Sequence, residues 1–598
     1  MIKKIFLPTI LLVLAYGFWI SPDFKEISAG VAVFLFGMLF LEEGFKAFTG
    51  GLLEKILAKT TDKLWKSLSF GVISTTLMQS SSLVSVITIS FLSAGLISLA
   101  AGIGIVFGAN LGTTTGAWLI AGFGLKVKIS AYAMPMLVFG IILVFQNSKH
   151  LKGIGYILAG LGFLFLGIHH MKEGFEAFRT TIDLKAFAVD GYPGLFLFAF
   201  LGVAATVIMQ SSHATLVIII TALSVGQITY ENGLALAIGA NVGTTITAII
   251  GSMSSNVQGK RLAGAHLIFN MVTALIAIAF IYQIMDAVDA FSAFVGIAHD
   301  DYTLKLAVFH TIFNTIGIIA MIPFIDQLVK FLTRAMPEKI VSVATPKYLS
   351  EAAESIPDSA IESVRKETLH LYDNAFVIIA HGLNLHRHDI KSQRDLNEII
   401  RDTSKPIPID IDAEYERNVK GLYSDIVMFI SRAQTQMTAE QGNELFELRS
   451  AGRDIVRAIK EIKHLHKNLS QYMQSDNQYI RDEYNKIRMN LLLVLRSLEE
   501  AKEGDDILFL DELKLELEIS DKKANETLEE LIHNDSITAP MATSLINDLA
   551  YAYHVADKLM QMGEVLFAKG DLDMKEAERS LVLDKDEMEE IIASQNNG

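Results

Sequence analysis

Long apolar stretches interrupted by short polar ones dominate the first 333 residues. No Asp, Glu, Lys or Arg occurs from Ser67 to Leu125, and Glu231 is the only such residue from Gly191 to Gly259. These stretches far exceed the roughly 20 apolar residues that a helix needs to cross a bilayer. The pattern therefore predicts a membrane domain with several spanning helices.

The first two predicted spans are residues 1–20 and 27–48. The first has the basic start and apolar run of a signal peptide, but no small-residue cleavage site follows, so we interpret it as a span and keep cleavage as the alternative. Residues 51–67 alternate apolar residues with lysines, which is typical of an amphipathic helix at a lipid surface. Five lysines against two acidic residues in 46–66 place this loop and the N-terminus in the cytoplasm.

Two polar stretches stand inside apolar segments, and each occurs twice. TTLMQSSSLVSV, with the glutamine at Gln79, is matched by TVIMQSSHATLV, with the glutamine at Gln210. GANLGTT (108–114) is matched by GANVGTT (239–245), at the same distance from its glutamine. Unwound backbone at membrane depth is tolerated only where protein or a water-filled cavity covers it. We therefore expect re-entrant hairpins or broken helices at these stretches.

The apolar spans are duplicated as well. FLFGMLFLEEGFKAF (34–48) is similar to FLFLGIHHMKEGFEAF (163–178), with Gly44 matching Gly174. The loop after the first copy is rich in lysine, whereas residues 172–190 hold three basic and four acidic residues. This asymmetry indicates that the copies face opposite sides of the membrane, which means inverted-topology repeats.

The rest of the chain completes an all-α architecture. Two further spans are predicted at 261–282 and 303–331. From Ile361 onward, apolar residues recur at spacings of three and four, which predicts a bundle of roughly five to seven helices. The predicted domains are an N-terminal transmembrane helix (1–26), repeat 1 (27–150), repeat 2 with closing helices (151–337), a linker (338–360) and a soluble helical bundle (361–598).

Charge separates the two halves and excludes some functions. Residues 1–333 hold 19 basic and 16 acidic side chains, and the remainder holds 32 and 50. The acidic soluble half argues against a nucleic-acid partner. The chain has no cysteine, which excludes disulfides and thiolate metal sites. No GxSxG, P-loop or HExxH motif occurs, so we do not expect an enzyme.

The polar stretches suit an ion. Amide and hydroxyl oxygens are ligands for a hard cation such as sodium, while amide and hydroxyl donors and helix N-termini suit an oxyanion. With no central Lys or Arg, a multivalent anion would bind better together with cations, so we expect cation-coupled uptake. The alternative is that these small residues only line tight helix contacts. The inverted duplication favours a binding site near the bilayer midplane.

Other polar residues have simpler interpretations. One set lies at the ends of the matched helices and is interpreted as interface anchors rather than proton relays: Glu42, Glu43, Glu173, His169 and His170. A second set comes from two His-x-x-Phe-Asn patterns, each with His and Asn on one helix face. We expect its members to satisfy one another across helices rather than to contact substrate: His266, Asn270, His310 and Asn314.

The paired Gln-Ser-Ser and GAN-x-GTT motifs resemble the signature of type II sodium-dependent phosphate (Na/Pi) cotransporters over roughly residues 25–335. The resemblance implies inorganic phosphate as substrate and sodium as the coupling ion, with no other cofactor or metal. By position it implies these substrate and sodium ligands: Gln79, Ser80, Ser81, Ser82, Gln210, Ser211 and Ser212. It implies these supporting ligands: Asn110, Thr113, Thr114, Asn241, Thr244 and Thr245. His213 stands where the first copy has Ser82, so we expect a different stoichiometry or pH response.

The soluble half resembles a PhoU-like helical domain. The metal motif of that domain is Glu-x-x-x-Asp, but the best matches here begin at Tyr553 and Ser450, so no bound metal is predicted. We expect a regulatory or dimerising role, with a second copy of the chain as partner. The sequence as a whole indicates a bacterial inner-membrane, multi-pass sodium/phosphate symporter working by alternating access, with a cytoplasmic bundle. Phosphate export and phosphate sensing through the bundle are the alternatives.

Overall fold

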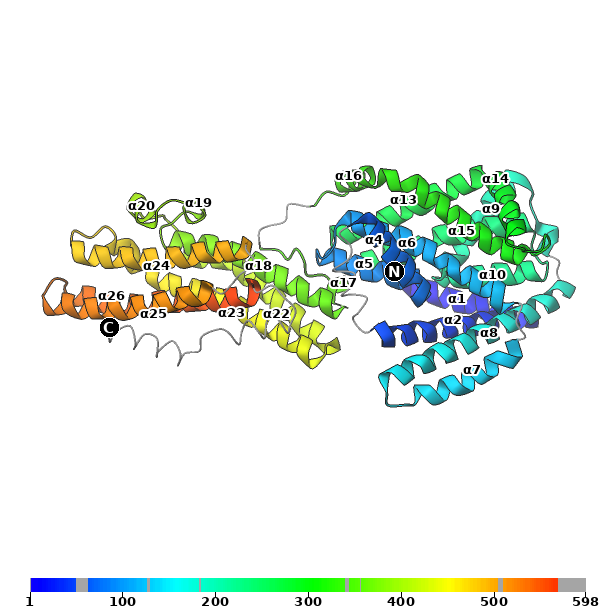
Figure 1. The fold of residues 1–598 in the computed structure, drawn as a ribbon, viewed down its shortest axis with the longest axis horizontal. Helices are drawn as coiled ribbons and strands as arrows, with labels where there is room; N and C mark the ends of the chain where they lie inside the picture. Colours follow the sequence, from blue (N-terminus) through cyan, green and yellow to red (C-terminus); the bar gives the residue numbers. More distant parts are fainter. Residues whose placement is uncertain are drawn as a thin grey trace. The chain divides into compact units, whose positions relative to one another are not determined.

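The computed structural model describes residues 2–49, 63–125, 129–181, 184–338, 344–354, 356–503 and 509–567. All regular elements in these ranges are helices, and no strand occurs there (Figure 1). The chain divides into two compact units. Unit 1 comprises Met1–Glu338 and Ser350–Ala352, and unit 2 comprises Lys339–Leu349 and Ala353–Gly598. The all-α prediction is confirmed.

Unit 1 is a membrane unit. Seven stretches of its described helices are long and apolar enough to span a bilayer, beginning at Pro22, Leu99, Lys149, Gly191, Tyr230, Val257 and Tyr302. The prediction of a polytopic membrane protein is confirmed. Most of the predicted amphipathic segment 51–67 lies outside the described residues. The helices are α1 (Ile2–Ile20), α2 (Pro22–Thr49), α4 (Leu64–Met78), α5 (Ser81–Ser93), α6 (Leu99–Trp118), the π-helical η1 (Leu119–Gly124), α7 (Ile129–Val144), α8 (Lys149–Thr181), η2 (Leu184–Phe187), α9 (Gly191–Met209), α10 (Ser212–Ser224), α11 (Tyr230–Gly243), α12 (Thr245–Ser252), α13 (Val257–Ala279), α14 (Ile281–Phe294), α15 (Tyr302–Met321), η3 (Ile322–Phe324) and α16 (Ile325–Ala335).

Large hydrophobic side chains lie on the outside of unit 1. Phe145 at the end of α7 is 81% exposed, Phe200 on α9 is 67% exposed and Leu275 on α13 is 54% exposed. In water such a surface would promote association, whereas in a bilayer it is the surface that contacts lipid. These positions therefore mark the lipid-facing side of the helices.

Glycines bring α2 and α8 into close contact along their length. Gly30, Gly37 and Gly44 recur every seventh residue of α2. A Cβ added at Gly37 would lie 2.5 Å from the backbone nitrogen of Leu164, and one at Gly30 would lie 2.6 Å from that of Met171. Only glycine permits this approach of two backbones. The partner's number falls as the α2 number rises, so the two helices run antiparallel (Figure 1).

The same contacts reveal the symmetry of the repeats. Gly37 packs on Leu164, and Gly167 packs on Phe34. Residues 130 positions apart thus exchange places across the interface, which is the signature of a two-fold relation. Because α2 and α8 begin the two repeats and run antiparallel, the repeats have inverted topology, as the loop charges predict.

Within each repeat a short hairpin packs beside a longer helix. The hairpin α4–α5 lies against α6, and α9–α10 lies against α11. A Cβ at Gly108 would overlap the carbonyl oxygen of Leu68, and one at Gly239 would overlap that of Ala199. The glycines of GAN-x-GTT therefore allow helices to approach one another. The stretch GANLGTT is helical and not unwound, because α6 continues to Trp118; in the second repeat the helix is interrupted at Thr244.

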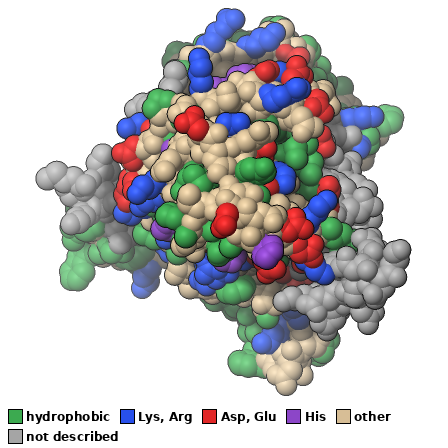
Figure 2. Space-filling view, turned by 90° about the vertical axis from the view of Figure 1, so that its left-hand side faces the viewer, with side chains coloured by type: hydrophobic (Ala, Val, Ile, Leu, Met, Phe, Trp, Pro, Cys, Tyr) green, Lys and Arg blue, Asp and Glu red, His purple; other side chains and the backbone are tan. Residues whose placement is uncertain are grey.

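Unit 2 is a helical bundle around one hydrophobic core that includes Phe376, Ile459 and Leu495. Buried Arg488 donates to the carbonyl oxygens of Leu383 and Thr403, which fixes the loops around α20. Charged side chains of both signs are interspersed on the face drawn in Figure 2. Its helices are α18 (Pro357–Gly382), α19 (Arg387–Ile390), α20 (Leu396–Asp402), α21 (Ile411–Tyr415), η4 (Glu416–Lys420), α22 (Gly421–Ala433), η5 (Gln434–Gln436), α23 (Ala439–Tyr472), α24 (Gln478–Glu503), α25 (Phe509–His533) and α26 (Ala539–Phe567); the short α17 (Glu351–Glu354) precedes them.

Candidate functional site

The two motif glutamines break their hairpins in the same way. Gln79 ends α4 with φ 52°, and Gln210 ends α9 with φ 54°. A residue other than glycine in this left-handed region costs on the order of 1 kcal/mol or more, and such residues cluster at functional sites. Because glycine would fit both positions without strain, the repeated glutamine points to a role for the side chain.

The first serine of each motif starts the second helix of its hairpin. Ser80 Oγ accepts a hydrogen bond from the backbone N–H of Leu83 at 3.3 Å, and Ser211 Oγ accepts one from Ala214 at 3.2 Å. These N-caps place the positive ends of α5 and α10 directly after the broken turns. The next serines, Ser81 and Ser212, are buried in the first turns of those helices.

The Gln79 amide is held by its nitrogen. Its Nε2 donates to the carbonyl oxygen of Thr76 at 2.6 Å and to Thr115 Oγ1 at 3.1 Å. Its Oε1 lies 3.1 Å from the position that a Cβ on Gly116 would occupy. This orientation engages the amide nitrogen and leaves the amide oxygen as the atom that could contact a ligand. Gln210, in contrast, is exposed.

Each hairpin contacts the helical segment that follows the hairpin of the other repeat, and the two contacts are reciprocal. Ser82 Oγ lies 3.2 Å from Thr247 Oγ1. The positions 131 residues away are His213 and Gly116, and they also meet, because a Cβ at Gly116 would overlap the imidazole of His213. One contact therefore pairs two hydroxyls, and its symmetry-related counterpart pairs an imidazole with a glycine. Sequence reasoning noted His213 but missed Gly116 and Thr247, although the offset of 131 links both pairs.

Most of the predicted supporting residues bond to their own helices. Asn110 Nδ2 donates to the carbonyl oxygen of Val106 at 2.9 Å. The threonine hydroxyls do the same three or four residues back, with these donors: Thr113, Thr114, Thr244 and Thr245. In this arrangement the hydroxyl protons are engaged and the oxygen lone pairs are what remains for a cation.

Asn241 differs because it connects three helices. Its Nδ2 donates to Asn270 Oδ1 at 3.2 Å on α13 and to Asn314 Oδ1 at 3.0 Å on α15. The asparagines of the two His-x-x-Phe-Asn patterns are thus joined through Asn241. The neighbouring His266 and His310 are buried, and neither His266 nitrogen has a hydrogen-bond partner in the described structure.

One contact of the charged residues at the helix ends joins α8 to α2, and another lies within α8. His170 Nδ1 is 2.7 Å from Glu26 Oε1 on α2, and His169 Nε2 is 3.3 Å from Glu173 Oε1 on the same helix. Only the His170 contact has the geometry of an interface anchor. None of these contacts includes Gln79, Gln210 or a motif serine, so they stand apart from the hairpins.

The sequence of unit 1 matches the family described as Na+/Pi-cotransporter over residues 33–173 and 194–299. Both copies of both motifs lie inside these ranges. Over these ranges the membrane unit is similar to the Na+/Pi-cotransporter family. This is a family of transport proteins, so the predictions of phosphate-transporter kinship and of a protein that is not an enzyme are confirmed. The PhoU-like resemblance of unit 2 stays a prediction.

Several curated proteins match the chain at low sequence identity. "Putative inorganic phosphate export protein YjbB" of Escherichia coli O157:H7 is 24% identical over 422 residues, which cover 70% of this chain and 72% of the relative. The protein of the same name in Salmonella typhimurium is 22% identical over 429 residues, covering 71% and 74%. "Uncharacterized protein YqeW" of Bacillus subtilis is 26% identical over 317 residues, covering 52% and 98%. No solved structure matches the chain.

Proposed function

We propose that this protein is a sodium-coupled transporter of inorganic phosphate, with the ions bound between the two Gln-Ser-Ser hairpins. The observation that supports it most is the reciprocal contact of each hairpin with the other repeat, Ser82 with Thr247 and His213 with Gly116. These contacts lie between two inverted repeats, which is where transporters of this architecture bind their substrates.

The chemistry of the hairpins supports a shared anion and cation site. Serine hydroxyls and the free N–H groups at the starts of α5 and α10 are donors for phosphate oxygens. The amide oxygen of Gln79 and the oxygens of Ser82 and Thr247 are ligands for sodium. No Lys or Arg lies in residues 67–125, so a phosphate anion buried here needs a bound cation to offset its charge. This requirement is the physical basis of the proposed coupling.

The proposed transport cycle depends on the two inverted repeats. Alternating access then consists of one repeat moving against the other around the ion site. We propose that the protein lies in the bacterial inner membrane with unit 2 in the cytoplasm, on the basis of the lysine-rich segment 46–66.

Export is the second candidate, because relatives carry the printed name "Putative inorganic phosphate export protein YjbB". The same site and the same cycle serve either direction, and the ion gradients set the net flux. Phosphate sensing is the other alternative, in which the protein binds phosphate at the same site but does not transport it.

The test uses the purified full chain in proteoliposomes, with labelled phosphate outside and either sodium or choline as the cation. We expect uptake with an inward sodium gradient and a loss of about 10-fold or more on Gln79→Ala or Gln210→Ala. Gln146→Ala is the matched control, because Gln146 is exposed just after α7 and its side-chain Nε2 donates to the carbonyl oxygen of Ile142. Phosphate binding without flux would refute transport and favour sensing.

Direction needs a second measurement. Cells that produce the protein are loaded with labelled phosphate and moved to phosphate-free medium. Symport inward predicts retention of the label while the sodium gradient is intact. Release faster than from cells producing the Gln79→Ala variant would establish export instead.

A further inference from the structure

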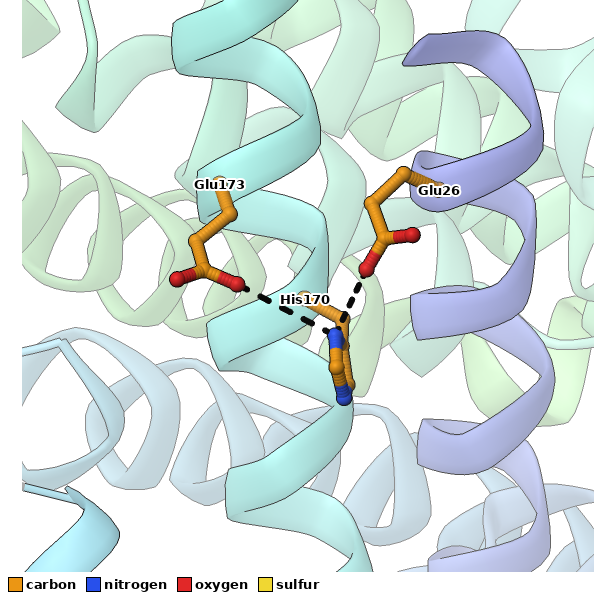
Figure 3. Close-up of side chains that lie close together, drawn as sticks. All are labelled: Glu26, His170 and Glu173. Carbon is orange, nitrogen blue, oxygen red and sulfur yellow. Dashed lines mark hydrogen bonds and ion pairs between the residues drawn. The ribbon is translucent and has the colours of Figure 1, made fainter. Parts of the chain in front are cut away.

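Three side chains of residue types that commonly ligate metals converge at one end of the α2 and α8 pair (Figure 3). His170 Nδ1 on α8 lies 2.7 Å from Glu26 Oε1 on α2 and 4.0 Å from Glu173 Oε2, one turn along α8. The three ligand atoms all lie within 4.8 Å of one another. Two carboxylates from different helices thus share a single imidazole.

The charges at this place are not balanced by basic side chains. Among the described residues, no lysine or arginine forms an ion pair with Glu26 or Glu173; the nearby Lys172 pairs with Glu176 at 3.9 Å. His169 Nε2 lies 3.3 Å from Glu173 Oε1 and leaves Oε2 directed toward His170. At metal sites, the carboxylate oxygen that does not contact the metal commonly accepts such a hydrogen bond, which orients the carboxylate.

The symmetry of the repeats shows that packing does not require these residues. The positions 130 residues from Glu26 and His170 are Tyr156 and Phe40, and they form the corresponding contact at the other end of the helix pair. There the two rings meet edge to face, with centroids 5.3 Å apart. The helix pair therefore closes with an aromatic contact at one end and with an imidazole between two carboxylates at the other.

We propose that Glu26, His170 and Glu173 form a binding site for a zinc-class divalent ion, which ties the two repeats together at this end. One imidazole nitrogen and two carboxylate oxygens suit Zn²⁺ or Co²⁺ better than Mg²⁺ or Ca²⁺, which prefer oxygen ligands only. Tetrahedral zinc at about 2.0–2.1 Å from its ligands places them about 3.3 Å apart. The observed separations of 2.7 and 4.0 Å lie on either side of that value.

The side chains have the freedom and the access that binding requires. His170 is 36% exposed and Glu26 and Glu173 are 44% and 55% exposed, so an ion reaches them from outside and a water completes its coordination. Binding of an ion to the folded pair stabilises it by mass action. The site does not depend on the identity of the transported ion.

The control is the double variant Glu26→Tyr with His170→Phe. It reproduces the contact between Tyr156 and Phe40 at the opposite end of the α2 and α8 pair. Purified full-length wild type and this double variant are titrated with ZnCl₂ by calorimetry and with CoCl₂ by visible absorption. We expect the wild type to bind one ion more per chain than the variant and to melt at a higher temperature with zinc. Glu173→Gln, which keeps the shape of the side chain, should weaken this binding by at least 10-fold.

His169→Ala tests the orienting role and should weaken zinc binding by about 10- to 100-fold. Equal zinc stoichiometry and affinity in wild type, the double variant and Glu173→Gln would overturn the proposal. If the double variant does not fold, the comparison of wild type with Glu173→Gln decides alone. Transport of phosphate is not a readout here, so the outcome is separate from that of the proposed function.

Discussion

At the scale of single residues, the same strained turn is built twice with the same side chain. Gln79 and Gln210 both occupy the left-handed region, which glycine would occupy more easily. The sequence predicts that the helices break near these motifs because the stretches are polar and duplicated. It does not predict which residue takes the positive φ, because glutamine carries no signal for that conformation.

Replacing Gln79 with glycine separates the turn from the amide. Gln79→Gly keeps a residue that favours the left-handed turn and removes the ligand oxygen, so we expect unchanged thermal stability. We expect sodium-dependent uptake to fall by about 10- to 100-fold, since a hydrogen bond to a charged group is worth about 1.5–3 kcal/mol. Uptake equal to that of the wild type would show that the amide is not a ligand.

The two reciprocal contacts between the repeats differ in chemistry, and this difference predicts the number of sodium ions that take part in uptake. His213→Ser with Gly116→Thr copies the Ser82–Thr247 hydroxyl pair into the second position. If a hydroxyl pair helps to bind sodium, this variant gains a second set of ligands, and the Hill coefficient for sodium in uptake should rise by about one.

The control for this exchange is His213→Ser alone, which removes the imidazole beside Gly116 and supplies only one of the two hydroxyls of the pair. It should leave the sodium Hill coefficient unchanged. An identical coefficient in wild type and the double variant would mean that the hydroxyl pair only holds helices together.

At the scale of elements, glycine spacing sets the contact between the repeats. The sequence shows that 34–48 matches 163–178, and loop charge predicts inversion. It does not show that α2 and α8 pack on each other, because a seven-residue glycine period fits many partner helices. The GAN-x-GTT glycines illustrate the same limit: they look like signs of unwound backbone, but they serve the packing of α6 on α4 and of α11 on α9.

A single methyl group tests the α2–α8 contact. In Gly37→Ala the new Cβ meets the backbone of Leu164 at 2.5 Å, where no flexible side chain can yield. We expect a loss of about 1–3 kcal/mol in stability, as for other overpacked cores, read as a lower melting temperature in detergent. Gly122→Ala is the control, because its Cβ meets only Leu304 at 4.0 Å. Equal melting temperatures for the two variants would contradict the close contact.

In unit 2 a buried carboxyl on α26 gives a pH-dependent stability. Asp548 Oδ2 accepts from the Tyr484 hydroxyl at 2.6 Å. Burial raises the pKa of Asp548, opposed by hydrogen bonds from Tyr484 and Asn468. A raised pKa means that the folded state holds the proton more tightly, so stability falls as pH rises from the unfolded pKa through the folded one.

Asp548→Asn keeps an acceptor for Tyr484 and removes the titration. We expect the variant to be more stable than wild type at pH 8 by on the order of 1 kcal/mol, with the difference shrinking toward pH 4. Protection of α24 and α26 amides from hydrogen exchange in the full chain reports this locally. A variant that is less stable than wild type at pH 8 would contradict it.

At the scale of the whole molecule, composition already separates the halves, because charge and apolar runs change sharply along the chain. The hydrophobic core of unit 2 lies within residues 353–567, and a core of unit 1 lies within 34–313. The proposed ion site could be predicted only as a list of residues. Which atoms face each other across the repeats depends on the two-fold packing, and a single sequence does not contain that information.

Separate cores predict that the membrane unit works without the bundle. A chain that ends after Glu338 should insert into the membrane, and its membrane unit should melt at the same temperature as in the full protein. It should also take up phosphate with the same sodium Hill coefficient. Its maximal rate should lie within about 2-fold of the full chain unless unit 2 restrains or activates transport. A truncated protein that keeps its melting transition but shows no uptake would make unit 2 part of the transport machinery rather than its regulator.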